Sequence, residues 1–123
     1  MRENKFRGRI RDRFADRGKF WYWSLPDTFD NDYVDFLDWE TVGQYTELKD
    51  KNGREIFEGD ILKRGDTTDE VIFKEGAFCI KFYSKNYKSY YTKTMQEALS
   101  YGINRWEIIG NVYENPELLL NKK

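Results

Sequence analysis

The chain has 123 residues, of which 39% are hydrophobic and 35% are charged, and its formal net charge is −1. This length indicates one domain, which buries enough surface to fold without a disulfide or a metal. The longest uncharged runs are far shorter than the ~20 residues of a membrane-spanning helix. The first residues also lack the basic start and apolar stretch that are typical of a signal peptide. We therefore expect no membrane segment.

Two residue counts restrict the chemistry. Cys79 is the single cysteine, and the chain has no histidine. One cysteine cannot form an internal disulfide, which fits a reducing cytoplasm. Zinc sites need several Cys or His ligands, so a zinc site is not expected. Without histidine, serine and cysteine lack the usual base that activates a nucleophile. We expect a cytoplasmic protein that is not an enzyme and needs no metal and no cofactor.

Charge is unevenly distributed along the chain. Residues 1–20 carry eight basic and three acidic side chains, whereas residues 21–42 carry six acidic and no basic ones. The acidic side chains do not follow the spacing of a calcium-binding loop, because Val34 and Asp35 stand where a ligand and the required glycine belong. The first third of the chain is therefore dipolar rather than metal-binding.

A strand over residues 5–11 would place its cations on one face, because successive side chains alternate. These cations are Lys5, Arg7, Arg9 and Arg11. One interpretation is a ridge that contacts nucleic-acid phosphates or an acidic partner, with exposed rings among Trp21, Tyr22 and Trp23 for stacking on bases. The other is a solvated face that the acidic residues of 27–40 neutralise.

Aromatic residues make up 18% of the chain, which favours β-structure because rings fit a pleated, half-buried surface. Residues 19–25 carry apolar or aromatic side chains on both faces, so we expect a strand that is covered on both sides. Residues 27–40 show no period, which predicts a loop. Asn52 and Gly53 form the strongest turn signal of the chain.

The second half of the chain predicts further strands. Residues 64–69 are polar and predict a loop, and a hairpin follows with arms at 70–74 and 77–85 around Gly76. Residues 105–114 predict the last strand, within which a glycine indicates a bulge or a close backbone crossing.

One short helix is expected over residues 95–101. Thr94 can accept from the first free amides, Glu97 completes a capping box, and Gly102 is a typical helix end. Together the elements predict a mainly β fold, a small and partly open barrel or sandwich of antiparallel strands with one short helix near residues 94–102.

Three blocks of the sequence resemble the YopX family, a group found in phages and prophages. Residues 43–63 read GQYTELKDKNGREIFEGDILK, where the family pattern is QYTGLKDKNGKEIYEGDIV. The KFRG and GKFWY runs that begin at residues 5 and 18 are similar to the opening of the family. Residues 106–119, WEIIGNVYENPELL, are similar to its EVIGNIYENPELL ending.

The resemblance implies a mainly β fold, a bacterial cytoplasmic setting and a mobile-element origin, but no reaction, since the function of the family is unknown. It implies a single domain over residues 1–123, with a charged, aromatic part at 1–42 and a β core that carries the motifs at 43–123. For several motif residues we expect a structural role at turns and sheet corners. These are Gly43, Gln44, Tyr45, Asn52, Gly53, Glu58, Gly59, Asp60, Gly110, Asn111, Asn115 and Pro116. Glu47 stands where the family favours glycine, and we expect an ordinary backbone conformation there.

These features favour a non-enzymatic interaction module that binds protein partners or assembles with its own copies. The aromatic excess and the dipolar first third support it, because the basic strand of one copy could meet the acidic segment of another. The alternative is a small nucleic-acid-binding β-barrel. It would use Lys5, Arg7, Arg9 and Arg11 with Trp21 and Trp23.

Overall fold

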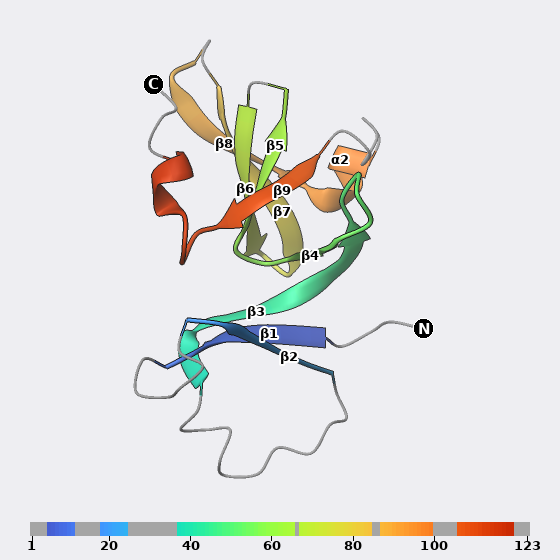
Figure 1. Ribbon diagram of the computed structural model, residues 1–123. Helices are drawn as coiled ribbons and strands as arrows, with labels where there is room; N and C mark the ends of the chain where they lie inside the picture. Colours follow the sequence, from blue (N-terminus) through green and yellow to red (C-terminus); the bar gives the residue numbers. More distant parts are fainter. Residues whose placement is uncertain are drawn as a thin grey trace.

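The computed structural model describes residues 5–11, 18–24, 37–65, 67–84, 87–99 and 106–119. The described strands form two antiparallel sheets, which lie one above the other in Figure 1. The strand order is β2-β1-β3-β4 in the first sheet and β8-β7-β6-β5-β9 in the second. The predicted mainly β fold of antiparallel strands is therefore confirmed, and the sheets stay open instead of closing into a barrel.

The first sheet is built around β1 (Lys5–Ile10), which lies between β2 (Phe20–Ser24) and β3 (Leu37–Lys49). β3 is 13 residues long, and Figure 1 shows its far half running from this sheet toward the second one. There it pairs with the short strand β4 (Glu55–Phe57). The boundary between residues 42 and 43 that the sequence suggested lies inside β3, so one strand belongs to both parts.

Two predictions for the first sheet are wrong. The loop expected over 27–40 ends early, because residues 37–40 already belong to β3; the rest of that loop lies outside the described residues. β2 is not covered on both sides, since Trp21 and Tyr22 are exposed while Trp23 is buried. The position of β2 at the edge of the described sheet explains this exposure.

The second sheet contains the remaining five strands. They are β5 (Asp60–Arg64), β6 (Thr67–Lys74), β7 (Ala77–Ser84), β8 (Ser89–Thr94) and β9 (Glu107–Asn111). The hairpin predicted around Gly76 is confirmed, with Phe73 opposite Phe78 and Lys74 opposite Ala77. β9 comes last in the chain and returns to the side of β5 that β6 leaves open.

The polar loop expected over residues 64–69 is shorter than predicted. Residues 67–69 already belong to β6, and Thr67 pairs with Arg64 directly across the turn. The Oγ1 of Thr67 donates to the Arg64 carbonyl over 2.9 Å, so polar side chains here close a tight hairpin.

The predicted helix is present as α2 (Met95–Leu99). The Oγ1 of Thr94 accepts from the Glu97 amide over 3.1 Å, which confirms the capping interaction. The expected end at Gly102 lies outside the described residues. After β9, a 3-10 helix, η2 (Pro116–Leu119), follows Asn115. None of the described helices has the length and apolarity that a membrane crossing requires.

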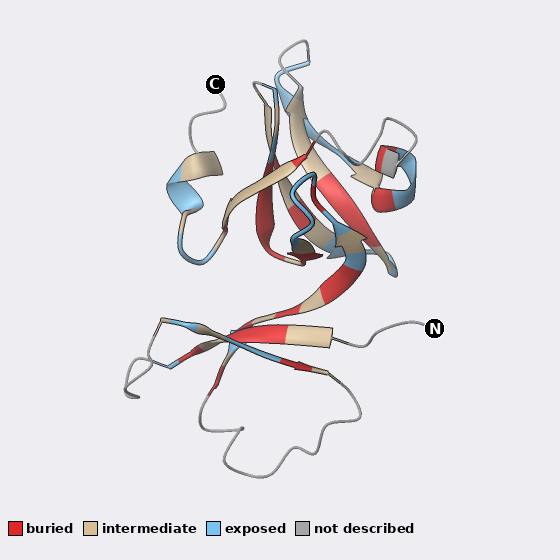
Figure 2. Ribbon diagram, turned by 45° about the vertical axis from the view of Figure 1, so that its right-hand side comes forward, coloured by how far each residue is buried: buried red, intermediate tan, exposed pale blue. Residues whose placement is uncertain are grey.

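The main core lies in the second sheet and is closed by α2 and Trp106. Figure 2 shows buried residues on the strands of this sheet and on the far half of β3. The core cluster consists of Ile56, Leu62, Val71, Phe78, Ile80, Met95, Ala98 and Trp106. Because Ile56 comes from β4, the first sheet also contributes to this core.

Candidate functional site

The two sheets are joined by a buried ion pair. Arg7 in β1 donates from Nη2 to Oδ1 of Asp60 in β5 over 2.6 Å. Arg7 is 6% exposed and Asp60 is 1% exposed. The other carboxylate oxygen of Asp60 accepts from the Phe57 amide over 2.7 Å. One carboxylate therefore holds both the first sheet and the bend that enters the second.

Two rings enclose the guanidinium of Arg7. Its central carbon lies 4.8 Å from the Phe20 ring centroid and 5.0 Å from that of Phe57. Arg7 Nε is buried and makes no hydrogen bond among the described residues. Burial raises the pKa of the Asp60 carboxyl above its ordinary value, and the positive charge of Arg7 opposes this shift.

A groove of about 440 Å³ lies beside the ion pair. It is lined by Arg7, Tyr22, Arg54, Glu55, Phe57, Asp60 and Ile108. Its other charges are also compensated, because Lys5 Nζ lies 2.6 Å from Glu55 Oε2 and Arg54 Nε lies 3.5 Å from Asp50 Oδ2. The groove has the volume of a ligand pocket, roughly 300–1,000 Å³, but its balanced charges do not select a charged ligand. We assign it to the joint between the sheets.

The start of the 43–63 block brings β3 against the bend before β5. A Cβ atom on Gly43 would lie 2.5 Å from the carbonyl oxygen of Glu58. The neighbouring Gln44 carbonyl accepts from the Glu58 amide over 3.0 Å. Tyr45 is buried, and its ring centroid lies 5.5 Å from that of Phe57. Only glycine at position 43 permits this close backbone approach.

The middle of the block is organised by Asp50. Its Oδ1 accepts from the amides of Asn52 and Arg54, each over 2.9 Å. Its Oδ2 accepts from the Ile108 amide in β9 over 3.0 Å. Gly53 has φ +80°, which confirms the turn expected at this position. Asp50 thus fixes the turn and ties it to the last strand.

The end of the block makes the bend that enters β5. Gly59 has φ +95°, a conformation that favours glycine. Its amide donates to the Val71 carbonyl over 2.9 Å, and its carbonyl accepts from the Val112 amide over 2.8 Å. Glu58 and Asp60 flank it, and burial raises the pKa of the Glu58 carboxyl. These residues thus connect β5 to β6 and to the segment after β9.

The last block forms a turn after β9. The Oδ1 of Asn111 accepts from the amides of Tyr113 and Glu114, each over 3.0 Å. The Oδ1 of Asn115, directly before Pro116, accepts from the Asn111 amide over 3.2 Å. The bulge expected at Gly110 is present, because the register shifts beside it. The alternative, a close backbone crossing, is not what fills the space there: a Cβ on Gly110 would collide with the Asn115 side chain.

This network of glycines and polar side chains is what the 43–63 and 106–119 blocks build. Residues 9–120 match the family model described as YopX protein. The chain belongs to the YopX family. Among curated proteins, none matches it. The YopX motif residues hold the backbone at the joint between the sheets and at two turns.

One expectation drawn from the YopX pattern is wrong. Glu47, where the family favours glycine, has φ +72° instead of an ordinary conformation. This left-handed conformation costs a residue with a side chain about 1–2 kcal/mol. The preference for glycine therefore has a conformational reason, and this chain carries a strained residue in β3.

Most cations of the predicted basic face of β1 make contacts within the chain. Arg7 is buried on Asp60, and Lys5 pairs with Glu55. Arg11 donates from Nε to the Leu37 carbonyl over 2.9 Å, and the half-buried Arg9 lies beside it on β1. The prediction that these cations form one exposed stripe is therefore wrong, because the partner carboxylates come from β4 and β5. The acidic residues before position 37 lie outside the described residues.

Of the two tryptophans proposed for stacking, one is exposed. Trp23 is 9% exposed and packs on Phe6, with ring centroids 5.8 Å apart. Trp21 is 38% exposed. A buried Trp23 cannot stack on a base, so that part of the predicted nucleic-acid surface is wrong.

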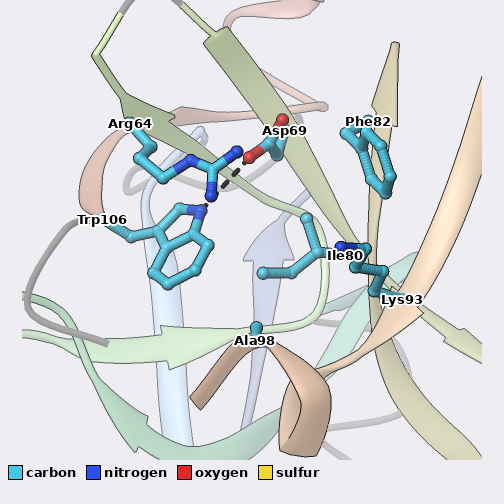
Figure 3. Close-up of a pocket in the computed structure, with 7 residues that line it drawn as sticks. All are labelled: Arg64, Asp69, Ile80, Phe82, Lys93, Ala98 and Trp106. Carbon is cyan, nitrogen blue, oxygen red and sulfur yellow. Dashed lines mark hydrogen bonds between the residues drawn. The ribbon is translucent and has the colours of Figure 1, made fainter. Parts of the chain in front are cut away.

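A second cavity, of about 50 Å³, lies between the second sheet and α2. Figure 3 shows its polar end, where Asp69 Oδ2 accepts from Trp106 Nε1 over 3.1 Å and the Arg64 guanidinium lies 5.2 Å from the Trp106 ring. Ile80 and Ala98 line its apolar side. One water occupies about 30 Å³ in the liquid, so this cavity is too small for an organic ligand.

Within the described ranges, no three side chains among His, Cys, Asp and Glu are grouped so that they could hold a metal ion.

The sequence did not lead us to one surface, the outer half of the β7–β8 hairpin. Tyr87, Tyr90 and Tyr91 are 74%, 50% and 43% exposed there. The signal was available, because residues 76–96 contain four lysines and no acidic residue.

Proposed function

We propose that this YopX chain is a non-enzymatic interaction module that associates with its own copies through the tryptophan face of the first sheet. The tryptophan face consists of Trp21, Trp23 and Trp39. The observation that carries the proposal is the exposure of Trp21 and Trp39, 38% and 43%, whereas Trp23 is buried. Trp23 and Trp39 are in contact, with ring centroids 6.3 Å apart.

Exposed indole rings favour association because contact removes a large apolar area from water. Tryptophan and tyrosine are enriched in protein interfaces and provide most of the binding energy at many of them. Here the two exposed indoles belong to β2 and β3, and neither is part of the main core cluster.

Exposed charges of opposite sign lie close to the tryptophans in the chain and suit a pair of copies. Lys19 directly precedes β2 and Glu40 lies in β3, and both are exposed. β2 and β3 lie on opposite sides of β1. In two copies related by a two-fold axis, the basic side of one can meet the acidic side of the other. From the sequence, we expect the basic face of β1 to contact the partner copy. Because Arg7 of that face already forms an ion pair with Asp60, the proposed contact is between Lys19 and Glu40 instead.

The setting that we propose is the cytoplasm of a bacterium that carries the phage or prophage. The buried free thiol of Cys79 is compatible with a reducing compartment, and the sequence resemblance implies a mobile-element origin.

Sedimentation velocity over a range of protein concentrations tests the proposal. We expect the wild type to dimerise with rising concentration, more strongly at about 50 mM than at about 500 mM salt, because screening weakens the charge contacts. Trp39→Ser should stay monomeric. Phe73→Ser is the matched control, since Phe73 is 50% exposed on the other sheet, and it should dimerise like the wild type. A monomeric wild type at both salt concentrations would overturn the proposal.

A further inference from the structure

The β7–β8 hairpin carries aromatic rings on both of its faces. Tyr83 lies opposite Tyr90, and Phe82 lies opposite Tyr91. Residues directly opposite each other share a face, and successive residues alternate between faces. The Tyr83 and Tyr90 rings are therefore on one face, with centroids 5.2 Å apart, and the Phe82 and Tyr91 rings are on the other, 6.2 Å apart.

This hairpin begins in the core and ends in solvent. Phe78 and Ile80, near the start of β7, are 9% and 3% exposed. Beyond them, Tyr87 and Tyr90 are 74% and 50% exposed. Figure 1 shows β8 at the opposite end of the molecule from β1 and β2. The outer half of the hairpin is thus a surface separate from the tryptophan face.

Each face also carries an ammonium group beside a ring. Lys81 Nζ lies 5.1 Å from the Tyr90 ring centroid, and Lys93 Nζ lies 5.7 Å from that of Phe82. Lys85 and Lys88 belong to the same stretch, residues 76–96, which contains no acidic residue; Lys85 lies outside the described residues. Across the sheet, Glu70 in β6 lies opposite Lys81. The hairpin therefore keeps an excess of positive charge.

We propose that the outer half of the β7–β8 hairpin binds single-stranded nucleic acid. Unpaired bases stack on exposed aromatic rings, and the phosphates between them pair with nearby cations. Tyr87, Tyr90 and Tyr91 supply the rings, and Lys81 and Lys93 supply ammonium groups on the two faces. Stacking depends on the face of the base and not on its edge, so the binding should be tolerant of sequence.

Other anionic partners match this surface less well. An acidic polypeptide would pair with the lysines but would leave the rings in water. In a duplex the bases already stack on each other, so only the phosphates remain to be bound. A lipid surface favours aliphatic side chains at the point of insertion, whereas the outer residues 87–92 are Tyr, Lys, Ser and Thr.

Fluorescence anisotropy with the full chain and labelled single-stranded poly-dT tests the proposal. We expect saturable binding that weakens with salt, because bound lysines release counterions. Tyr90→Ser should weaken binding about 5- to 150-fold, the usual effect of losing one stacked base. Tyr90→Phe is the matched control, because it keeps the ring and should keep the affinity. Lys81→Gln with Lys93→Gln should lower the salt dependence by about 1.4 in the log–log slope.

Further probes separate this surface from the alternatives. Trp39→Ser and Arg11→Gln change the first sheet and should bind poly-dT like the wild type. A duplex of the same length, polyglutamate and vesicles with phosphatidylserine should bind more weakly than poly-dT. Equal affinity of Tyr90→Ser and the wild type for poly-dT would overturn the proposal, provided that the two proteins have the same melting temperature. No binding of poly-dT at about 50 mM salt, or stronger binding of any other probe, would overturn it as well.

Discussion

Arg7 in β1 and Asp60 in β5 form a buried ion pair of 2.6 Å that joins the two sheets of the domain. Arg7→Met leaves the Asp60 carboxylate buried without a cation. We expect the free energy of unfolding to fall by about 3–5 kcal/mol, because an uncompensated buried charge is more costly than a lost contact. Urea denaturation of the wild type and the variant measures the loss.

A double variant distinguishes the charge from the packing. Asn in place of Asp60 keeps an oxygen that can accept from the Phe57 amide but carries no charge. Arg7→Met combined with Asp60→Asn should therefore unfold at a higher urea concentration than Arg7→Met alone. If the double variant is less stable than the single one, the unpaired charge is not the cause of the loss.

This ion pair marks the limit of what the sequence predicts. The turns at Gly53 and Gly76, the cap of α2 by Thr94 and the bulge at Gly110 all follow from signals within a few residues, and the structure contains them. Arg7 and Asp60 are 53 residues apart in the chain. Their contact depends on the long strand β3, which runs from the first sheet toward the second, and no single segment encodes that arrangement. Alternation alone therefore placed Arg7 on a solvated face.

The same reasoning explains two other misses. Tyr90 and Tyr91 put rings on both faces of β8, so this strand lacks the alternation of apolar and polar residues that identifies a half-buried strand. Position 47 carries a glutamate, which is unfavourable at positive φ, so the residue type itself did not predict that conformation. Comparison with the family pattern gave the correct signal there.

The approach of β3 to the bend before β5 predicts a steric effect at Gly43. Gly43→Ala would bring a Cβ to 2.5 Å from the Glu58 carbonyl oxygen, so the backbone must move. We expect a loss of about 1–3 kcal/mol in the free energy of unfolding, as for other overpacked sites. Faster hydrogen exchange of the Glu58 amide, which donates to the Gln44 carbonyl, should accompany it. Unchanged stability and exchange would show that the approach is looser than described.

The strained residue in β3 predicts a stabilising substitution. Glu47→Gly should raise the free energy of unfolding by about 1 kcal/mol, because glycine adopts a φ of +72° without the steric penalty. Lys49→Gly is the control in the same strand. Lys49 is exposed and is not among the residues with positive φ, so glycine there should lower stability by about 0.5–1 kcal/mol. Thermal unfolding of the two variants gives the sign of each change, and a loss in both would contradict the strain at Glu47.

The hydrogen bonds of Asp50 predict how stability depends on pH. Burial raises the pKa of this carboxyl, but the amides of Ile108, Arg54 and Asn52 together bring it below the ordinary value of 3.8. A lowered pKa means that the folded state favours the ionised form. The stabilisation is present above the unfolded pKa and is lost as pH falls through the folded one. Asp50→Asn should therefore lower the free energy of unfolding at pH 7, by about 1–3 kcal/mol for the weakened hydrogen bonds.

The difference between the wild type and Asp50→Asn should shrink in acid, as Asp50 of the wild type becomes protonated. Comparing the two proteins at each pH isolates Asp50, because Asp60, with its raised pKa, acts in the opposite direction in both. Glu117→Gln is the control, since Glu117 is exposed and has no part in the proposed contacts, and its difference from the wild type should stay small. Urea denaturation between neutral pH and about pH 3 measures these differences, and a constant gap for Asp50→Asn would mean that its carboxylate is not stabilised by the three amides.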